Sequence, residues 1–373
     1  MMQRNTPPFR ADHVGSLLRP PELLLARDAR AADKISAAAL RAAEDRAIHD
    51  AVARQESVGL RAVTDGEFRR TFFHLDFLRQ FGNVEVVTAR VKARFHTDAG
   101  DIEMQPPALQ VVGKLSRPKP IFLDDFRYLQ SVAHAVPKLT LPSPSAMHFR
   151  GGRGAISLEA YPDMAEFYAD LADVYAQEIA DLAAVGCRYL QLDEVNLAYL
   201  CDPSLRAHVA NIGEDADTLP ATYATLINRS LAGRPPGMTV CMHLCRGNFQ
   251  SGWVAEGGYD PVAELLFNAI DVDGYFLEYD TPRAGSFAPL RFVPKGKTVV
   301  LGLLSSKTGV LESRDELKRR VDEAARFVPL EQLALSPQCG FASTVEGNLL
   351  SIEQQYAKLR LVVELAQEIW GSA

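Results

Sequence analysis

The stretch TVCMHLC, residues 239–245, has the composition of a buried β-strand and carries a histidine and a cysteine two positions apart. Side chains alternate between the two faces of a strand, so His243 and Cys245 are expected to point to the same side. Seven more short apolar runs are spaced along the chain, separated by segments with helical periodicity. They are HVGSL (13–17), RAVTDGE (61–67), KLTLPSP (138–144), YLQLDEV (189–195), GYFLEYD (274–280), TVVLGLLSS (298–306) and LALSPQCG (333–340).

The segments between these runs have the pattern of amphipathic helices. In residues 312–328 an apolar stripe follows a Ser-x-x-Glu capping signal at Ser313 and Glu316, and residues 347–370 repeat the stripe. Eight strands that alternate with helices are typical of a closed parallel barrel. We therefore predict an α/β fold, namely a single (β/α)8 TIM barrel. This barrel is predicted to form one catalytic domain over residues 1–373. Residues 82–137 alternate only weakly and are predicted to form a hairpin inserted after the second strand.

The amino-acid composition limits the classes of protein to which this chain can belong. Apolar residues make up 47% and charged residues 23% of the chain, as in an ordinary globular enzyme. The formal charge of −7 argues against a nucleic-acid partner, which would need clustered Lys and Arg. The start has no apolar signal-peptide core, and no apolar run approaches the roughly 20 residues that span a bilayer. We therefore predict a cytoplasmic enzyme with small-molecule substrates, and free thiols or metal ligands among its five cysteines.

The chemistry of such barrels lies at the carboxyl ends of the strands, and every predicted strand ends in polar or thiol groups. One imidazole, two thiols and a carboxylate among them would suit zinc, which takes nitrogen, sulfur and oxygen ligands. The alternative is that the two thiols are small buried apolar groups and that the histidine is a hydrogen-bonded core residue. The second thiol and the strand-end positions favour the metal. The predicted zinc ligands are His243, Cys245, Glu278 and Cys339, whereas Cys187, Cys201 and Cys241 are predicted to be structural.

Six runs together resemble the catalytic barrel of cobalamin-independent methionine synthase over nearly the whole chain. Within that family they resemble the short branch with a single barrel. Its members are usually labelled 5-methyltetrahydropteroyltriglutamate–homocysteine methyltransferase-like. They are HVGS, DGEFRR, YLQLDEVNLAYL, CMHLCRGNF, FLEYD and LSPQCGFAS. The resemblance implies methyl transfer to the thiol of homocysteine, giving methionine, at a zinc ion held by the four residues above. It also implies that Ser16, Glu67 and Asp193 bind the amino-acid end of homocysteine.

The chemistry of a thiol agrees with this expectation. A thiol with a pKa near 8.5 is mostly protonated at neutral pH, and zinc ligation deprotonates it. Two cysteinates, one carboxylate and one neutral imidazole around Zn²⁺ would keep an arriving sulfur electron-rich. Glu278 is the weakest of the four ligands and is expected to yield its place to the substrate.

The identity of the methyl donor is where the sequence departs from the long enzymes of this family. Those enzymes have a second, amino-terminal barrel, a histidine after the seventh strand and a tryptophan near the third. Here Leu304 and Ser305 stand nearest the histidine, and PSPS (142–145) replaces the tryptophan. The donor is therefore 5-methyltetrahydrofolate, a methylcorrinoid or another small methyl compound. Lys307 could donate a proton or bind an anionic tail, and the alternative for it is a solvated loop lysine.

Two other functions fit the same residues. One is a zinc-dependent alkyl transferase that acts on another thiol, as in enzymes that open epoxides with coenzyme M. The other is a non-catalytic barrel with a structural zinc. Glu67 and Asp193 disfavour the first, because a sulfonate would need cations where these carboxylates stand. A replaceable ligand would disfavour the second, because structural zinc is usually closed by four tight ligands.

Overall fold

Seven parallel strands form the central sheet of the protein, which is described by a computed structural model over residues 4–89, 92–97 and 99–373. Nearly every residue of these strands is buried, as expected when both faces of a parallel sheet are covered. In sheet order the strands are β1 (Ala62–Val63), β6 (Val136–Pro142), β7 (Tyr189–Glu194), β8 (Thr239–Leu244), β9 (Gly274–Glu278), β10 (Thr298–Leu304) and β11 (Leu333–Pro337).

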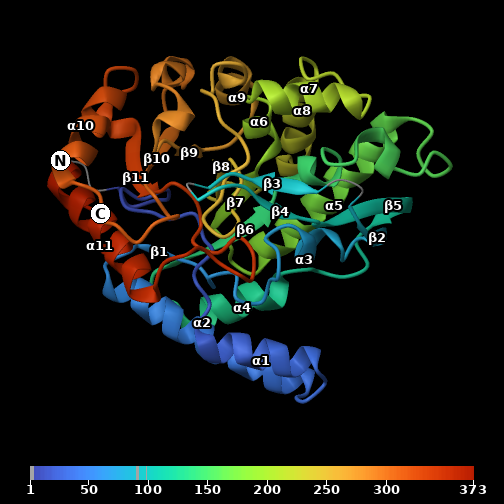
Figure 1. Ribbon diagram of the computed structural model, residues 1–373, viewed down its shortest axis with the longest axis horizontal. Coiled ribbons are helices and arrows are strands. Elements are labelled where there is room, and N and C mark those ends of the chain that lie inside the picture. Colours follow the sequence, from blue (N-terminus) through green and yellow to red (C-terminus); the bar gives the residue numbers. More distant parts are fainter. Residues whose placement is uncertain (1–3, 90–91, 98) are drawn as a thin grey trace.

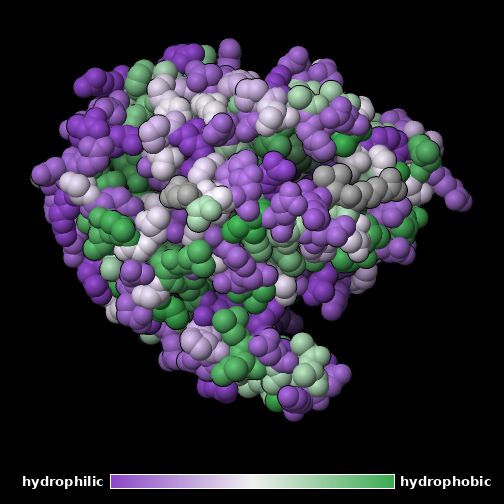
Figure 2. Space-filling model, in the orientation of Figure 1, coloured by the Kyte–Doolittle hydropathy of each residue, from purple (hydrophilic) through white to green (hydrophobic). Residues whose placement is uncertain are grey.

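Helices connect these strands and lie around the sheet (Figure 1). The longer ones are α1 (Pro21–Ala31), α2 (Ala37–Ser57), α4 (Leu123–Val132), α5 (Met164–Ala184), α7 (Pro203–Asn211), α8 (Leu219–Leu231), α10 (Arg314–Ala324) and α11 (Ile352–Trp370). Short helices are α3 (Leu75–Leu78), α6 (Asn196–Tyr199) and α9 (Ala263–Ala269), and 3₁₀ turns are η1 (Pro144–Met147), η2 (Gly152–Ala155), η3 (Pro282–Ala284), η4 (Ala288–Phe292) and η5 (Leu330–Gln332). Among the described residues, no helix combines the length and apolar character needed to span a membrane. On the face of the molecule that Figure 2 shows, hydrophilic residues cover most of the surface.

Both helices that we predicted from apolar stripes are present, with shorter bounds. Helix α10 begins after Ser313, whose hydroxyl accepts a hydrogen bond from the backbone N–H of Glu316 at 3.4 Å. Helix α11 begins after Ser351, where Ser351 and Gln354 form a complete capping box. The predicted core positions of α10 are buried against the sheet. Residue 328, predicted to be the last of the stripe, lies beyond the end of that helix.

The predicted first strand, HVGSL (13–17), is not a strand. Instead Ala11 forms an isolated parallel bridge with Leu335 of β11, and the N–H of Asp12 donates to the carbonyl of Leu335 at 3.0 Å. Farther along, the N–H of Leu17 donates to the carbonyl of Gly66 at 3.0 Å. The segment 11–17 therefore lies between β11 and the end of β1, the two edges of the seven-stranded sheet.

The segment predicted as an inserted hairpin holds two antiparallel pairs. Strand β2 (Gly82–Thr88) pairs with β5 (Pro107–Ser116), and β3 (Ala93–Phe95) pairs with β4 (Ile102–Met104). The predicted span of 82–137 was too long at its end, because residues 123–132 form α4, which packs against α2 and β6. Residues 90 and 91 of the first alternating run lie outside the described residues.

A buried ion pair joins the amino-terminal segment to the interior of the sheet. The ammonium of Lys138 on β6 lies 3.1 Å from a carboxylate oxygen of Asp12 and 4.0 Å from the ring centre of Phe276, and both charged side chains are fully buried. The hydroxyl of Tyr189 on β7 donates to the other oxygen of Asp12 at 2.7 Å. Asp12 thus connects three parts of the sheet, because its backbone is also bonded to β11.

Replacing Lys138 with Met should leave the Asp12 carboxylate buried without its cation. We expect a loss of about 3–5 kcal/mol in the free energy of unfolding, measured by urea denaturation of the metal-free protein. The double variant Asp12→Asn/Lys138→Met should recover part of this loss, because neither charge is then left unpaired. A loss below about 1 kcal/mol for Lys138→Met, the range of an exposed pair, would contradict this account.

Candidate metal centre

Four potential metal ligands meet at the carboxyl ends of the strands. His243 lies on β8, Cys245 follows it, Glu278 is the last residue of β9, and Cys339 lies two residues beyond β11. One ligand atom from each of the four lies within 4.8 Å of the others, and all four side chains are buried. The structure thus brings together the four residues that the sequence predicted.

The spacing and orientation of these atoms fit a metal ion. The sulfur atoms of Cys245 and Cys339 are 3.5 Å apart, near the roughly 3.8 Å expected of two sulfur ligands at about 2.3 Å from a tetrahedral ion. Nδ1 of His243 lies 3.3 Å from the carbonyl oxygen of Phe276, so it carries the hydrogen. Nε2 of His243 is buried and has no hydrogen-bond partner in the described part of the chain. Its lone pair is therefore free to bind an ion.

Glu278 is held by bonds to both of its carboxylate oxygens. The backbone N–H of Arg246 donates to one at 2.9 Å, and the side-chain amide of Gln338 donates to the other at 3.3 Å. The hydroxyl of Tyr259 accepts from the backbone N–H of Glu278 at 3.0 Å and fixes the end of β9. Burial, followed by the neighbouring Cys339 thiol, raises the pKa of Glu278 to about 7. A cation would therefore stabilise the charged carboxylate strongly.

The thiols of Cys245 and Cys339 have different pKa values because one hydrogen atom lies in a hydrogen bond between their two sulfur atoms. The hydrogen bond from Cys245, followed by the charge that His243 can carry, lowers the pKa of Cys339 well below its ordinary value. The same hydrogen bond, together with burial, raises the pKa of Cys245. Burial also raises the pKa values of Cys187 and Cys201 to about 12, and neither belongs to the four-residue cluster.

Two buried carboxylates stand beside the cluster. Asp193 on β7 is paired in register with His243 on β8, and Glu67 lies in the loop after β1. The hydroxyl of Thr140 donates to one oxygen of Glu67 at 2.9 Å, while the other oxygen is buried without a partner in the described residues. Burial, followed by the charge of Glu67, raises the pKa of Asp193 to about 7, and burial also raises the pKa of Glu67.

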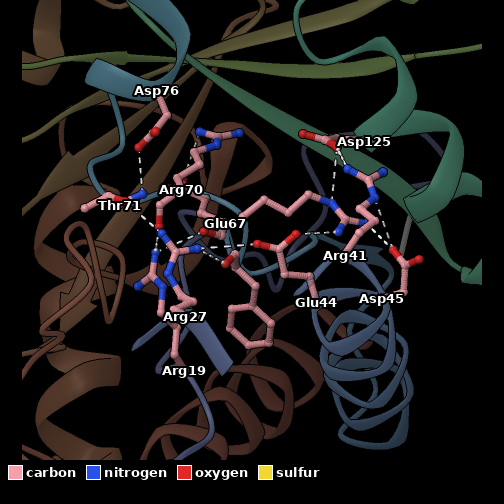
Figure 3. A network of polar contacts seen from close by, with 12 residues as sticks. Arg19, Arg27, Arg41, Glu44, Asp45, Glu67, Arg70, Thr71, Asp76 and Asp125 are labelled. Carbon is pink, nitrogen blue, oxygen red and sulfur yellow. Dashed lines mark hydrogen bonds and ion pairs between the residues drawn. The ribbon is translucent and has the colours of Figure 1, made fainter. Parts of the chain in front are cut away.

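The loop that carries Glu67 is tied to the loop that carries Cys339 by the buried guanidinium of Arg19. One nitrogen of Arg19 donates to the carbonyls of Glu67 and Arg70, at 3.0 and 2.8 Å. Its other terminal nitrogen donates to the carbonyls of Ala342 and Thr344, at 3.3 and 3.0 Å. Figure 3 shows Arg19 beside Glu67 and Arg70, within a wider network of ion pairs that fixes the same loop.

Ser16 lies against the loop after β11. Its carbonyl accepts a hydrogen bond from the N–H of Phe341 at 2.9 Å, and a Cβ on Gly340 would come within 2.0 Å of its hydroxyl. A side chain at position 340 would therefore displace the hydroxyl of Ser16. The position of Ser16 near the cluster agrees with the prediction, while its role in binding substrate stays a prediction.

Lys307 lies after β10 and is buried. Its ammonium donates three hydrogen bonds, to the carbonyl oxygens of Gly247 and Gly252 and to the side-chain oxygen of Asn248, at 3.2, 3.0 and 3.0 Å. It therefore holds the loop after β8 and is not a solvated loop lysine. Sequence patterns gave no signal for this contact or for the bonds of Arg19, because both join residues far apart in the chain.

Comparisons with known proteins agree with this site. Residues 9–368 match the family described as "Cobalamin-independent synthase, Catalytic domain". The chain is 46% identical to the uncharacterized protein YxjH of Bacillus subtilis, over 97% of this chain and 95% of that protein. It is 30% identical to the 5-methyltetrahydropteroyltriglutamate–homocysteine methyltransferase of Caulobacter vibrioides, over 90% of this chain but 39% of that enzyme.

A solved structure is similar over its whole length. It is that of a candidate vitamin-B12-independent methionine synthase from Listeria monocytogenes, which is 36% identical with a TM-score of 0.79 and covers 99% of this chain and 100% of that one.

The four-residue cluster predicts which cysteines bind metal. Cys245→Ser and Cys339→Ser should each lose most of the bound zinc, because each removes a thiolate ligand. Cys187→Ser and Cys201→Ser are matched controls and should keep it. Elemental analysis of the purified proteins gives the zinc content per chain. An equal loss of zinc in all four variants would contradict the assignment.

The raised pKa of Asp193 predicts a pH dependence of stability in the metal-free protein. The folded pKa is about 7, against about 3.9 for an unfolded Asp, so the folded state retains a proton between these values and the unfolded state does not. The free energy of unfolding should therefore fall as pH rises from about 4 to 7. Asp193→Asn should remove about 1–4 kcal/mol of that fall.

Urea unfolding of wild type and Asp193→Asn at several pH values tests this expectation, because the contributions of groups that do not interact with Asp193 cancel in the difference. Two curves that stay parallel from pH 4 to 8 would show it to be wrong.

Proposed function

The chain belongs to the family of the cobalamin-independent synthase catalytic domain, and on that basis we propose that it is a zinc-dependent methyltransferase that converts homocysteine to methionine. The main support is one arrangement of buried groups. Two thiols, an imidazole and a carboxylate surround one point, and two more carboxylates lie beside it. Such a site suits a metal ion together with a small substrate that carries both a thiol and an ammonium group.

Zinc is the metal that best matches the donor set, because thiolates and imidazole together favour it over the hard cations. His243, Cys245, Glu278 and Cys339 would hold it. When bound, zinc would keep a substrate thiol deprotonated at neutral pH. Glu278 is the ligand that we expect to give way to the substrate sulfur, since its carboxylate already has two other hydrogen-bond partners.

Glu67 and Asp193 would bind the ammonium group of homocysteine. Burial raises the pKa values of both carboxyl groups, and Arg70, 3.7 Å from one oxygen of Glu67, offsets this rise only in part. An ammonium between them would restore both carboxylates to the charged form. Ser16 and the neighbouring backbone would bind the carboxylate end of the same substrate, close to the glycine beside Cys339.

The transfer step sets the demands on the methyl donor. The thiolate sulfur attacks the methyl carbon, a carbon–sulfur bond forms, and the electron pair of the old bond leaves with the donor. If the donor is 5-methyltetrahydrofolate, the departing nitrogen needs a proton, whereas a methylcorrinoid needs none. Lys307 would be the proton donor or would bind an anionic tail, although in the described structure its three hydrogen bonds hold the loop after β8.

The proposal also includes the fold that carries the site. We infer that residues 1–373 form one catalytic domain and that the segment 11–17 takes the place of the first strand of a (β/α)8 barrel. The hydrogen bonds of Asp12 to β11 and of Leu17 to Gly66 support this inference. The antiparallel pairs of 82–116 would then be an insertion between the second and third positions of the barrel.

A methylation assay tests the proposed function directly. The zinc-loaded protein should form methionine from homocysteine with 5-methyltetrahydrofolate or with methylcobalamin, at a slower rate with the folate because of the proton that it requires. Coenzyme M in place of homocysteine tests the thiol. Methyl transfer to coenzyme M alone would favour the other alkyl transferase, and absence of transfer from every donor would favour a structural zinc.

Glu67→Gln and Asp193→Asn should weaken homocysteine binding without removing zinc. Each variant removes a charge-assisted hydrogen bond, so we expect a loss of about 1.5–3 kcal/mol in binding free energy. Titration calorimetry with homocysteine measures it, and zinc content in the same samples is the control. The Asp173→Asn variant of an exposed carboxylate on α5 should bind as the wild type does. If zinc is lost together with homocysteine affinity, these carboxylates support the metal centre instead.

A further inference from the structure

Three aromatic rings lie next to the thiols of the metal centre, on the side of the loops after β1, β6 and β7. Phe73 and Tyr199 pack against the buried cluster of Val195, Cys245 and Cys339. The ring of Phe149 meets that of Tyr199 edge to face, with 6.1 Å between the ring centres. These rings form an apolar wall beside the place where the methyl group would be transferred.

A histidine and an arginine stand against this wall. The ring of His74 lies against that of Phe73, inclined by 51° with 4.7 Å between centres, and a terminal nitrogen of Arg150 lies 3.1 Å from Nε2 of His74. Because arginine can only donate, Nε2 accepts and Nδ1 carries the hydrogen of the imidazole. His74 is 6% exposed, and its Nδ1 has no hydrogen-bond partner in the described residues. A buried donor without an acceptor is costly in the empty protein, which indicates a missing partner.

Arg150 has no carboxylate partner within the described ranges. His74 is the one side chain to which its guanidinium donates there. Arg150 itself is exposed to solvent. Through His74, which lies against Phe73, its charge is placed beside the aromatic wall next to the metal centre.

We propose that Arg150 and the Nδ1–H of His74 bind an anionic group of the methyl donor, a carboxylate or a phosphate, while the planar ring of the donor rests on Phe73 and Tyr199. This inference rests on the proposed function and names the class of its second substrate. A guanidinium and an imidazole N–H supply the two kinds of donor that such an anion accepts.

The donor fits this place better than homocysteine does. The charged end of homocysteine is accounted for by Glu67, Asp193 and Ser16, and two carboxylates would repel a second anion. Lys307, a buried cation near the metal centre, has its three hydrogens bonded to the loop after β8. The guanidinium of Arg246 is fully buried over the ring of Tyr259, 4.4 Å from the ring centre. Arg150 is exposed and has donors left for a ligand that arrives from solvent.

The test compares ligands with and without the anionic group. Titration calorimetry on the zinc-loaded protein should use 5-methyltetrahydrofolate against a 5-methyltetrahydropterin without the benzoylglutamate tail, and methylcobalamin against methylcobinamide, which lacks the phosphate together with the rest of the nucleotide. Arg150→Met should weaken binding of at least one ligand that carries the anionic group by on the order of tenfold or more, and binding of its counterpart without that group by less than about twofold. The pair in which the loss appears identifies carboxylate or phosphate.

Matched variants separate binding from folding. Arg150→Lys keeps the charge and should recover part of the affinity, and Arg127→Met, which removes an exposed cation on α4, should bind both ligands of a pair as the wild type does. His74→Asn keeps an N–H close to the position of Nδ1 and should bind the anionic ligand better than His74→Phe. Circular dichroism and zinc content confirm that each variant is folded.

The outcomes distinguish this inference from the proposed function. Equal losses for both ligands of each pair, a loss of homocysteine affinity alone, or a wild type that binds no donor would overturn the inference. A preference for the anionic ligand that Arg150→Met abolishes supports it, even if no methyl transfer follows, in which case the proposed function is the part that fails.

Discussion

The concentration of negative charge in one buried mouth is the constraint on which the rest of the site depends. Five acidic groups, the side chains of Glu67, Asp193, Cys245, Glu278 and Cys339, are each at most 7% exposed. Burying a charge without a counter-ion costs more than a folded domain can tolerate at several positions, so buried acidic groups shift their pKa toward the neutral form. Four of the five do so, and Cys339, which accepts the hydrogen bond of Cys245, is the exception. The pKa values of about 7 at Asp193 and Glu278 are that response. A metal ion and an ammonium would each relieve part of this cost, which is why the same arrangement can select both a cofactor and a substrate.

The scaffold fixes these acidic groups by bonds to the backbone. Asp193 and Glu278 lie at the ends of β7 and β9, and the other three groups lie in the loops after β1, β8 and β11. Loops are the parts of a barrel most free to move. Arg19 bonds four carbonyls in two of these loops, and Lys307 bonds the loop after β8. Each of these two cations bonds to carbonyl oxygens and forms no direct ion pair with the acidic groups of the site. Of the five groups, Glu67 has a buried ion-pair partner, Arg70 at 3.7 Å.

The metal centre could be predicted from the sequence because two general rules suffice for it. Alternation along a strand places His243 and Cys245 on one face, and parallel strands gather their carboxyl ends at one edge. The first strand was predicted wrongly because HVGSL has the composition of a strand, whereas the backbones of its neighbours bond to it only near its two ends. Side chains of Thr64, Lys138 and Gln191 bond to the carbonyls between. The pair of Arg150 and His74 gave no sequence signal at all. They are 76 positions apart and meet through two loops whose course depends on the packing of the whole fold.

The hydrogen bonds between the first and last parts of the sheet have a consequence for biosynthesis. Arg10 bonds to the carbonyl of a residue 321 positions later, and Cys339 lies farther along the chain than any other member of the metal cluster. A ribosome makes the chain from the amino end, so segment 11–17 must wait through almost the whole of translation before its partner strand emerges. Until then three of the four potential ligands are present without the fourth. Binding of an ion by the complete set is therefore a late event in the synthesis of the chain.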